Sequence, residues 1–194
     1  MIRILLVFVL AVLVIACAVR EERPAGAWLE EREQHFAEYP DWTVRGRLAL
    51  SDGQRGGSLG FEWSAEGDNH QIHLRTMTGG RQWRLDFGPG YALLEGTEID
   101  QMVGSDPDPL VEAAVGWPIP VSLMADWIRG LPAPADARLR FASDGSLAGL
   151  DHAVWTLDYQ RLREENGILM PRRIEANSAD YRVRLVLADW SFQH

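Results

Sequence analysis

Alternation of apolar and polar residues with a period of two is the feature that most constrains the fold of this chain. Successive side chains of a β-strand point to opposite faces, so this alternation predicts strands with one apolar and one polar face. The alternating runs cover residues 43–50, 58–63, 72–76 and 83–87. Glycine-rich turns at Gly79-Gly80 and Gly88-Pro89-Gly90 separate runs of this kind. We therefore expect an antiparallel meander with one apolar and one polar face.

Helical signals precede and interrupt the strands. The first predicted helix runs from Ala27 to about Tyr39 and ends before Pro40, which cannot continue it. One of its faces is formed by Trp28, Arg32, Phe36 and Tyr39. We expect this face to lie against the rest of the domain.

Two short helices are predicted in mid-chain, where the alternation stops. The first starts at Asp106-Pro107 and ends at Gly116. The second runs from about Val121 to Arg129 and closes on Gly130. Asp106 and Asp108 lie at a helix start, where carboxylates cap free amide groups, so capping explains them without catalysis.

Strands resume after these helices and complete the predicted sheet. The expected strands cover residues 137–141, 154–159, 168–176 and 181–189, with a turn at Asp144-Gly145. The total is about nine to eleven strands with two or three helices. A long, strongly twisted antiparallel sheet curls, and its concave face must be covered. The mid-chain helices are the natural cover.

Tryptophan is abundant, with eight residues in the chain, and Trp63, Trp83 and Trp155 fall within predicted strands. Each tryptophan taken singly is explained as bulky core. The functional interpretation is that a curled sheet lined by large apolar side chains leaves a hollow for an apolar ligand.

The N-terminus carries the only cysteine of the chain, Cys17, directly after Ala16. A basic residue, Arg3, and an apolar run from Ile4 to Ile15 precede it. The run is too short to cross a membrane as a helix. This arrangement resembles the signal peptide and lipobox of bacterial lipoproteins, which implies that Cys17 is acylated after cleavage. An ordinary secretory signal with an incidental cysteine, or a buried free thiol, are the alternatives.

These N-terminal features divide the chain into three parts. We expect residues 1–16 to be a signal peptide, residues 17–26 a lipidated N-terminus and flexible tether, and residues 27–194 a single domain. The residue after the cysteine is Ala18 and not the aspartate that holds lipoproteins at the inner membrane. The expected location is therefore the periplasmic face of the outer membrane, where the lipid anchors the chain.

Composition and motifs argue against several classes of function. The formal net charge of −9 does not suit a protein that follows nucleic-acid phosphates. The sequence Gly56-Gly57-Ser58-Leu59-Gly60 matches a nucleophile elbow but continues into a strand, so a glycine-rich hairpin is the better explanation. His70 and His73 would point to opposite faces of a strand, which argues against a metal pair. We expect no enzyme activity, no cofactor and no metal.

Several sequence blocks resemble the family of the outer-membrane lipoprotein receptor LolB. They follow the family's order and, with the lipobox at Cys17, span nearly the whole chain. The blocks are Trp42-Thr43-Val44-Arg45-Gly46-Arg47-Leu48-Ala49, Phe61-Glu62-Trp63, Gly116-Trp117-Pro118-Ile119-Pro120, Trp127-Ile128-Arg129-Gly130-Leu131-Pro132 and Leu187-Ala188-Asp189-Trp190. The first block and the two mid-chain blocks are the specific ones.

The resemblance implies a mainly β fold, an open half-barrel of about eleven antiparallel strands with short helices over a hydrophobic cavity. It implies that the chain accepts lipoproteins from a periplasmic, LolA-like carrier and inserts them into the outer membrane without nucleotide hydrolysis. The partners would be that carrier, lipoprotein acyl chains and outer-membrane lipid. We expect a monomer.

Site residues follow from the alternation and the resemblance together. The residues expected to line the acyl-chain cavity are Leu48, Phe61, Trp63, Leu74, Trp83, Leu85, Trp155 and Leu157. The residues expected on the covering helices are Trp117, Leu123 and Trp127. A register shift of one residue would turn the list of any one strand outward.

One loop departs from the family. In family members the turn between the third and fourth strands displays an exposed leucine that delivers lipoproteins to the membrane. The corresponding turn here runs from Thr76 to Arg81 and has no leucine. The expected membrane-facing turn is Met77 to Gly80, including Gly79, with Met77 or the nearby Trp83 as the lipid contact.

Two other functions remain open from the sequence. One is a general carrier of lipids or hydrophobic molecules on the same curled sheet. The other is a structural or assembly lipoprotein whose core is filled. A hydrolase built on Ser58 is a more distant alternative.

Overall fold

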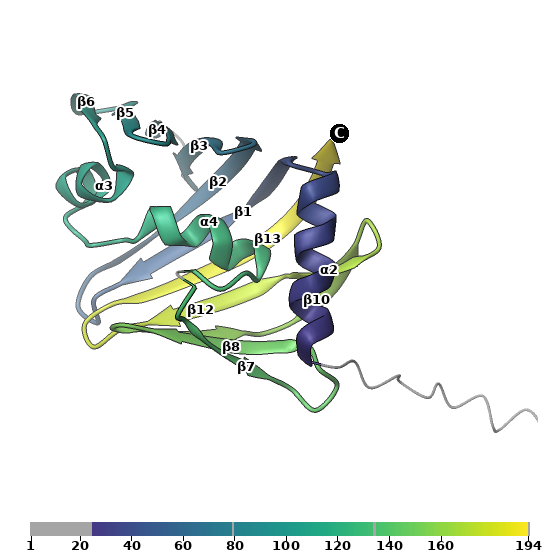
Figure 1. The fold of residues 1–194 in the computed structure, drawn as a ribbon. Helices are drawn as coiled ribbons and strands as arrows, with labels where there is room; N and C mark the ends of the chain where they lie inside the picture. The colour runs from purple at the N-terminus through teal and green to yellow at the C-terminus, as the bar shows by residue number, and fades with distance from the viewer. Residues whose placement is uncertain (1–24, 79, 134, 194) are drawn as a thin grey trace, which may run out of the picture.

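In the part of the chain that the structure describes, an eleven-stranded antiparallel sheet curls around three helices that lie on its concave face (Figure 1). The structure is a computed structural model and describes residues 25–78, 80–133 and 135–193. The expectations for the signal peptide, Cys17, residues 17–24 of the tether and Gly79 lie outside these residues. The predicted end of the tether is wrong, because Ala25 and Gly26 already belong to a helix. Within the described part, no helix has both the length and the apolar character needed to cross a bilayer.

The strands form one open sheet and one separate ribbon. The order in the large sheet is β6-β5-β4-β3-β2-β1-β13-β12-β9-β8-β7, and β10 pairs only with β11. The strands are β1 (Asp41–Ser51), β2 (Gly56–Glu66), β3 (Asn69–Thr76), β4 (Gln82–Gly88), β5 (Tyr91–Gly96), β6 (Ile99–Gly104), β7 (Arg138–Phe141), β8 (Leu147–His152), β9 (Trp155–Tyr159), β10 (Leu162–Glu165), β11 (Ile168–Pro171), β12 (Arg173–Asn177) and β13 (Arg182–Gln193). The prediction of an open, mainly β half-barrel with eleven antiparallel strands is confirmed.

The pairing of β1 with β13 joins the two halves of the sheet. The meander β1 to β6 extends from one side of this pair and the C-terminal strands extend from the other. Leu48 of β1 lies opposite Leu59 of β2 and Leu185 of β13. These residues share the concave face, so the alternation read from the sequence places the apolar side chains toward the helices.

The three helices end where the sequence predicts. They are α2 (Ala25–Glu38), α3 (Pro107–Val115) and α4 (Val121–Arg129). The Asp106 side chain accepts a hydrogen bond from the Asp108 amide at the start of α3, and Pro107 occupies its first turn. Gly116 and Gly130 close α3 and α4 with φ angles of 77° and 72°, which favour glycine.

Asp108, in the first turn of α3, also binds the start of the next helix. Its carboxylate accepts hydrogen bonds from the Ser122 amide (2.9 Å) and the Ser122 hydroxyl (2.8 Å) at the start of α4. The side chain therefore caps the next helix and joins α3 to α4. The sequence predicts a capping role for Asp108, but no local pattern indicates that its partner is Ser122.

Several strands differ from the prediction. Strands β5, β6, β8 and β10 had no predicted counterpart, and residues 168–176 were predicted as one strand. That single strand is wrong, because the chain leaves the β10–β11 ribbon at Pro171 and enters the main sheet at Arg173. Proline has no amide hydrogen for a continuing ladder, which is the signal that marks this break.

Helix α2 fixes one end of α4. The Trp28 indole donates to the Gly130 carbonyl (2.9 Å), and the Arg32 guanidinium donates to the Arg129 carbonyl (2.9 Å) and to the Leu169 carbonyl. Both side chains are fully buried, and the guanidinium of Arg32 stacks 3.2 Å above the Trp28 ring. A cation that binds the last carbonyls of α4 also interacts favourably with its helix dipole.

We predict that Gly46→Ala destabilises the fold while Gly57→Ala does not. A Cβ on Gly46 would lie 2.7 Å from the Phe61 ring and would clash with the Val186 carbonyl, whereas a Cβ on Gly57 meets nothing within 4 Å. The expected loss for Gly46→Ala is about 2 kcal/mol of unfolding free energy in urea, and the change for Gly57→Ala is below about 0.5 kcal/mol. Equal midpoints for the two variants would contradict this packing.

Candidate functional site

An apolar cavity lies between the meander and the segment that carries α3 and α4. Its volume is about 120 Å³, and every side chain that lines it is apolar. The strand residues in the wall are Leu48, Leu50, Leu59, Phe61, Trp63, Ile72, Leu74, Trp83, Leu85, Leu94 and Leu185. The residues from the covering segment are Val111, Ala114, Val115, Ile119, Val121 and Met124. Such a space can hold hydrocarbon, because its wall carries no charged group and no hydrogen-bonding side-chain group other than the indole N–H of Trp63 and Trp83.

Six of the eight expected lining residues meet in this wall. They are Leu48, Phe61, Trp63, Leu74, Trp83 and Leu85. The other two, Trp155 and Leu157, are buried in β9 outside the wall. Trp155 packs edge to face on Trp127 with ring centroids 6.1 Å apart. Neither residue lines the cavity, contrary to the expectation, because side chains fill this half of the concave face.

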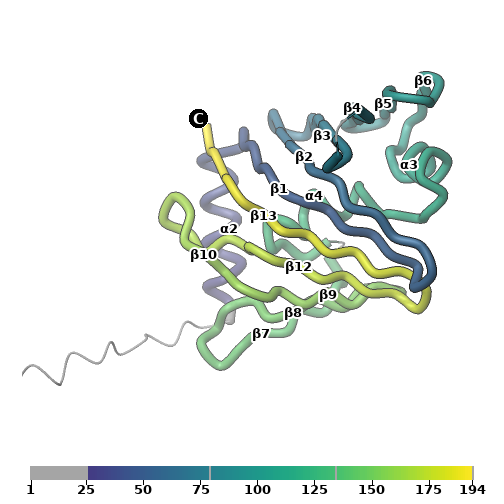
Figure 2. The backbone as a smooth tube through the Cα atoms, turned by 180° about the vertical axis from the view of Figure 1, so that it is seen from behind, coloured from purple at the N-terminus to yellow at the C-terminus, as the bar shows by residue number. Residues whose placement is uncertain are grey.

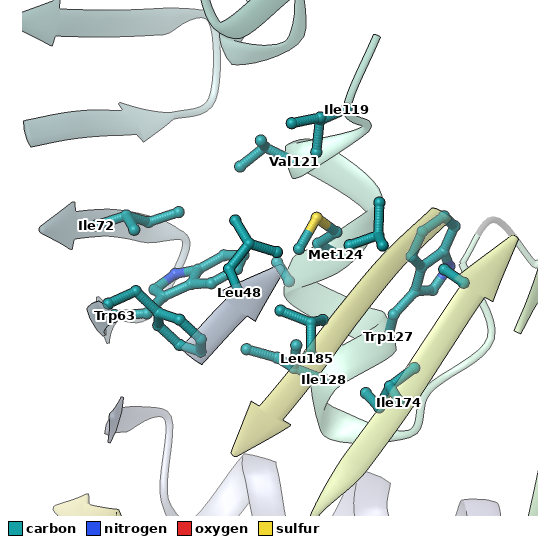
Figure 3. Packing of buried hydrophobic residues seen from close by; sticks show 14 of the residues in the cluster. Leu48, Trp63, Ile72, Ile119, Val121, Met124, Trp127, Ile128, Ile174 and Leu185 are labelled. Carbon is teal, nitrogen blue, oxygen red and sulfur yellow. The ribbon is translucent and has the colours of Figure 1, made fainter. Parts of the chain in front are cut away.

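Helix α4 separates the hollow half from the filled half. Figure 3 shows Met124 directed toward Leu48 on one side of the helix and Trp127 beside Ile174 on the other. Ile128, Leu157 and Ile174 are fully buried in the filled half. Dense packing of this kind resists deformation, so this half serves as a rigid base for the cavity.

The expected lid residues lie near the cavity but do not line it. Trp117 follows α3 and its ring lies 6.5 Å from Tyr181, and Leu123 is half-buried on α4. Trp127 is buried, and its indole donates to the Ala133 carbonyl (3.1 Å). These three residues hold the covering segment, while Val121 and Met124 present its cavity surface.

Sequence signals could have identified most of the missed strand residues. Leu50, Leu59 and Ile72 occupy the same faces of their strands as the predicted Leu48, Phe61 and Leu74, two positions away. The cavity residues of α3 and α4 had no comparable signal, because short helices leave the orientation of each face undecided by periodicity.

The β3–β4 turn carries an exposed apolar side chain, that of Met77. Met77 is 53% exposed, whereas Trp83 is half-buried in the cavity wall with its ring against Gly96. Val115, at the end of α3, lines the cavity and is 43% exposed. Val115 therefore marks a place where the apolar interior reaches the surface.

An aromatic cluster supports one end of the cavity. The indole of Trp63 donates to Nδ1 of His70 (3.2 Å), so the ring proton of neutral His70 resides on Nε2. The His70 ring stacks on Phe87 with centroids 4.8 Å apart. Burial, and secondarily the nearby Arg129 cation, lowers the pKa of His70 to about 4, against a smaller opposing effect of Asp68. His70 is therefore neutral at pH 7 and holds the Trp63 indole in place.

Candidate catalytic and metal-binding residues do not converge on this cavity. Ser58 lies in β2 opposite Ala49, within the ladder and not on a strand-to-helix turn. His70 points into the aromatic cluster, while His73 is exposed on the other face and contacts the Gln71 side chain (2.8 Å). Among residues 25–78, 80–133 and 135–193, no three His, Cys, Asp or Glu side chains gather as a metal site would require.

Comparison with known sequences identifies relatives over nearly the full chain. The family model described as "Outer membrane lipoprotein LolB" matches residues 40–190. A protein named "Outer-membrane lipoprotein LolB" from Alkalilimnicola ehrlichii is 34% identical and covers 97% of this chain and 96% of its own length. A protein of the same name from Ectopseudomonas mendocina is also 34% identical, with coverages of 98% and 97%.

Solved structures with a similar fold have little sequence in common with this chain. A DUF1329 family protein from Desulfovibrio piger matches with a TM-score of 0.56 and 9% identity, covering 88% of this chain and 93% of its own. A LolA superfamily protein from Nitrosomonas europaea matches with a TM-score of 0.52 and 11% identity, with coverages of 89% and 94%. The likeness at this identity concerns the fold.

We predict that stability falls as His70 becomes protonated. Because the pKa of His70 is lowered to about 4 in the folded state, the unfolded chain binds a proton between about pH 6.5 and 4 that the folded chain does not. The free energy of unfolding should therefore decrease by about 2 kcal/mol at this site as pH falls through that range. Urea unfolding at pH 7 and pH 4.5 measures the change. His70→Phe keeps an aromatic ring but cannot titrate, and an equal pH dependence in this variant would exclude His70 as the cause.

Proposed function

The chain belongs to the family of the outer-membrane lipoprotein LolB, and from this premise we propose that its apolar cavity accepts the acyl chains of lipoproteins from a periplasmic carrier and passes them to the outer membrane. Its role lies in lipoprotein localisation at the outer membrane, where a lipid holds it on the periplasmic face. The observation that carries the acceptor proposal is a cavity whose wall consists entirely of apolar side chains.

The physical need for such an acceptor follows from the cost of exposing hydrocarbon to water. Burial of each CH₂ group is worth about 0.8 kcal/mol, so the acyl chains of one lipoprotein carry on the order of tens of kcal/mol. Direct movement from one apolar cavity to another and then into a bilayer keeps the acyl chains out of water, so their free energy of burial stays nearly constant. A difference of a few kcal/mol in binding free energy between donor and acceptor then suffices to make the transfer run one way. Transfer of this kind needs no nucleotide.

The present cavity volume implies that the cover moves when a chain enters. A volume of about 120 Å³ lies below the range of about 300–1,000 Å³ that is usual for ligand pockets. The covering segment therefore lies close against the cavity wall in this structure. Met124, an unbranched and flexible side chain in the wall, can rearrange at low cost.

The hydrogen bonds of the covering segment indicate which part of it is held in place and which part can move. The C-terminal end of α4 is held by Trp28 and Arg32 through carbonyls of residues 129 and 130. The opposite end of α4 is tied to α3 through Asp108 and Ser122, so α3 and the start of α4 move as a unit. We infer that this unit swings about the anchored end of α4. Its displacement enlarges the hollow half and leaves the filled half unchanged.

Delivery requires a contact with the membrane, and we assign it to Met77. This side chain is exposed on the β3–β4 turn, whereas Trp83 is committed to the cavity wall. An exposed methionine can enter the acyl region of a bilayer without losing a hydrogen bond. Met77 would thus replace the leucine that the family displays on this turn.

We predict that Ala114→Phe blocks the cavity. Ala114 lines the hollow from α3, and a phenyl ring at this position would occupy the space that an acyl chain needs. Transfer of a lipoprotein from its carrier to the chain, followed by co-purification, should fall at least about tenfold, and binding of a fluorescent fatty acid should fall with it.

The matched control is Ala113→Phe, which adds the same ring on the exposed side of the same helix. It should transfer and bind like the unaltered chain. If Ala114→Phe also transfers normally, acyl chains do not use this cavity. If the unaltered chain binds neither probe nor lipoprotein, the domain is a structural one with a filled core.

We predict that Met77→Glu separates acceptance from delivery. Uptake from the carrier should stay within about twofold, because Met77 is exposed and lies outside the cavity wall. Insertion of the accepted lipoprotein into vesicles should fall about tenfold or more, because a carboxylate resists entry into hydrocarbon. The control is Val154→Glu, at an apolar residue of the β8–β9 turn that is 71% exposed. An equal loss in both variants would argue against a special role for Met77.

A further inference from the structure

Figure 2 shows the sheet from its convex side, with the helices behind it. The charged side chains of this face are mostly paired. Arg45 contacts Glu62, and Arg84 contacts Asp86 (2.8 Å) and Glu95 (3.0 Å). On the other half of the sheet, Arg173 (2.8 Å) and Arg184 (2.9 Å) share Glu175. Pairing of this kind is the usual state of arginines on a sheet surface, where opposite charges lie across neighbouring strands.

Arg47 and Arg75 depart from this pattern. Both are exposed on the convex face, and neither has an ion-pair or hydrogen-bond partner within the part of the chain that the structure describes. They lie in one cross-strand row, since Arg47 of β1 is opposite Gly60 of β2 and Gly60 is opposite Arg75 of β3. Two unpaired cations therefore flank a glycine on the central strands of a chain whose net charge is −9.

Gly60 forms the floor between these two arginines. A Cβ at this position would lie 3.3 Å from Nε of Arg75 and 3.9 Å from Sδ of Met77. The Arg75 side chain thus leans over the glycine toward Arg47, and the exposed sulfur of Met77 borders the same place. Glycine at position 60 lets the Arg75 side chain lie close over β2, a place that a Cβ would disturb.

Apolar side chains complete this surface. Val186 lies directly opposite Arg47 in the pairing of β1 with β13 and is 37% exposed. Met77 is 53% exposed at the other end of the row. We call Arg47, Gly60, Arg75, Met77 and Val186 the Arg47/Arg75 patch. Unpaired arginines beside exposed apolar groups suit the interface of a bilayer, where phosphates lie above hydrocarbon.

A groove of about 580 Å³ adjoins Arg75 and gives space for a headgroup. Its charged lining includes Glu62 and Glu95, which pair with Arg45 and Arg84. The carboxylates are thus neutralised by arginines of the same groove, and the charge of Arg75 remains in excess. The groove therefore attracts an anion at Arg75 and does not repel it.

We propose that Arg47 and Arg75 together bind the phosphate of a phospholipid headgroup and dock the convex face of the domain onto the membrane surface. Guanidinium groups suit phosphate because their planar donors form charge-assisted hydrogen bonds with its oxygens. The net negative charge of the chain repels an anionic surface elsewhere, so the docked orientation is set by this patch. Docking brings the Met77 turn against the bilayer, where the proposed delivery takes place.

The proposal concerns a surface apart from the cavity, and its test does not depend on acyl transfer. The lipid-anchored chain carrying Thr78→Cys, labelled with a polarity-sensitive fluorophore, is reconstituted into vesicles of phosphatidylethanolamine and phosphatidylglycerol. Thr78 is exposed on the same turn as Met77. Quenching by brominated acyl chains reports the ratio of docked to undocked domains, which is compared with vesicles of digalactosyldiacylglycerol, a bilayer lipid without phosphate.

We expect docking on phospholipid vesicles and little on the glycolipid. Arg47→Gln and Arg75→Gln should each lower the docked ratio about fivefold, and the double variant about twenty-five-fold, which is the size of one or two basic residues near an anionic lipid surface. The matched control is Arg138→Gln, an exposed arginine of edge strand β7 that also has no ion-pair or hydrogen-bond partner among the described residues. It should dock normally. All variants should have the same thermal unfolding midpoint as the unaltered chain, because none of them removes an ion pair or a hydrogen bond between described residues.

Five results would overturn the proposal, and the first four concern docking itself. They are unchanged docking in the double variant, equal docking on the glycolipid, an equal loss in Arg138→Gln, and displacement of the domain by millimolar inorganic phosphate at constant ionic strength, which would make free phosphate the ligand. Loss of lipoprotein uptake from the carrier with unchanged docking would assign the pair to a protein partner and overturn it too. The Ala114→Phe variant should dock normally, so failure of the cavity function and failure of this surface give different results.

Discussion

Curvature without closure is the constraint on which the rest of this structure depends. The sheet twists far enough to present a concave apolar face, but its edge strands β6 and β7 do not meet. Buried apolar area on that face must be covered, and a chain of this length supplies only three short helices among its described residues. The helices can pack one half of the face densely and roof the other half, and that division creates the cavity.

The buried Arg32 determines where this division falls. Its guanidinium, stacked on Trp28, binds carbonyls at the end of α4 and in β11, and so fixes the helix across the middle of the sheet. A buried cation without such partners would cost several kcal/mol, so the site holds its geometry strongly. Beyond the anchored end, α4 and α3 rest mainly on apolar contacts, which can slide or separate at lower cost than buried hydrogen bonds.

The two faces of the sheet differ in chemistry, and each suits a different contact. The concave face excludes charge almost entirely and offers hydrocarbon a dry surface. The convex face carries ion pairs and the unpaired Arg47 and Arg75, which suit a hydrated, charged surface. Because successive residues of one strand serve both faces, the block Arg45-Gly46-Arg47-Leu48 contributes to each. Gly46 makes room for Phe61 inside, and Arg47 stands outside.

The sequence by itself determined the inward face of strands β1 to β4, the ends of the helices and the family, because period-two alternation, capping residues and ordered motifs are local signals. Leu48, Phe61 and Trp63 were placed on the concave face in this way, and Gly116 and Gly130 marked two helix ends. Only the tertiary structure decided that Trp155 and Leu157 fill the core while Val121 and Met124 line the hollow, and that Arg32 is buried. Alternation fixes the side of a sheet on which a residue lies. The position of a covering helix along that side depends on contacts between residues such as Arg32 and Arg129, which lie about a hundred positions apart in the chain, and no local pattern records them.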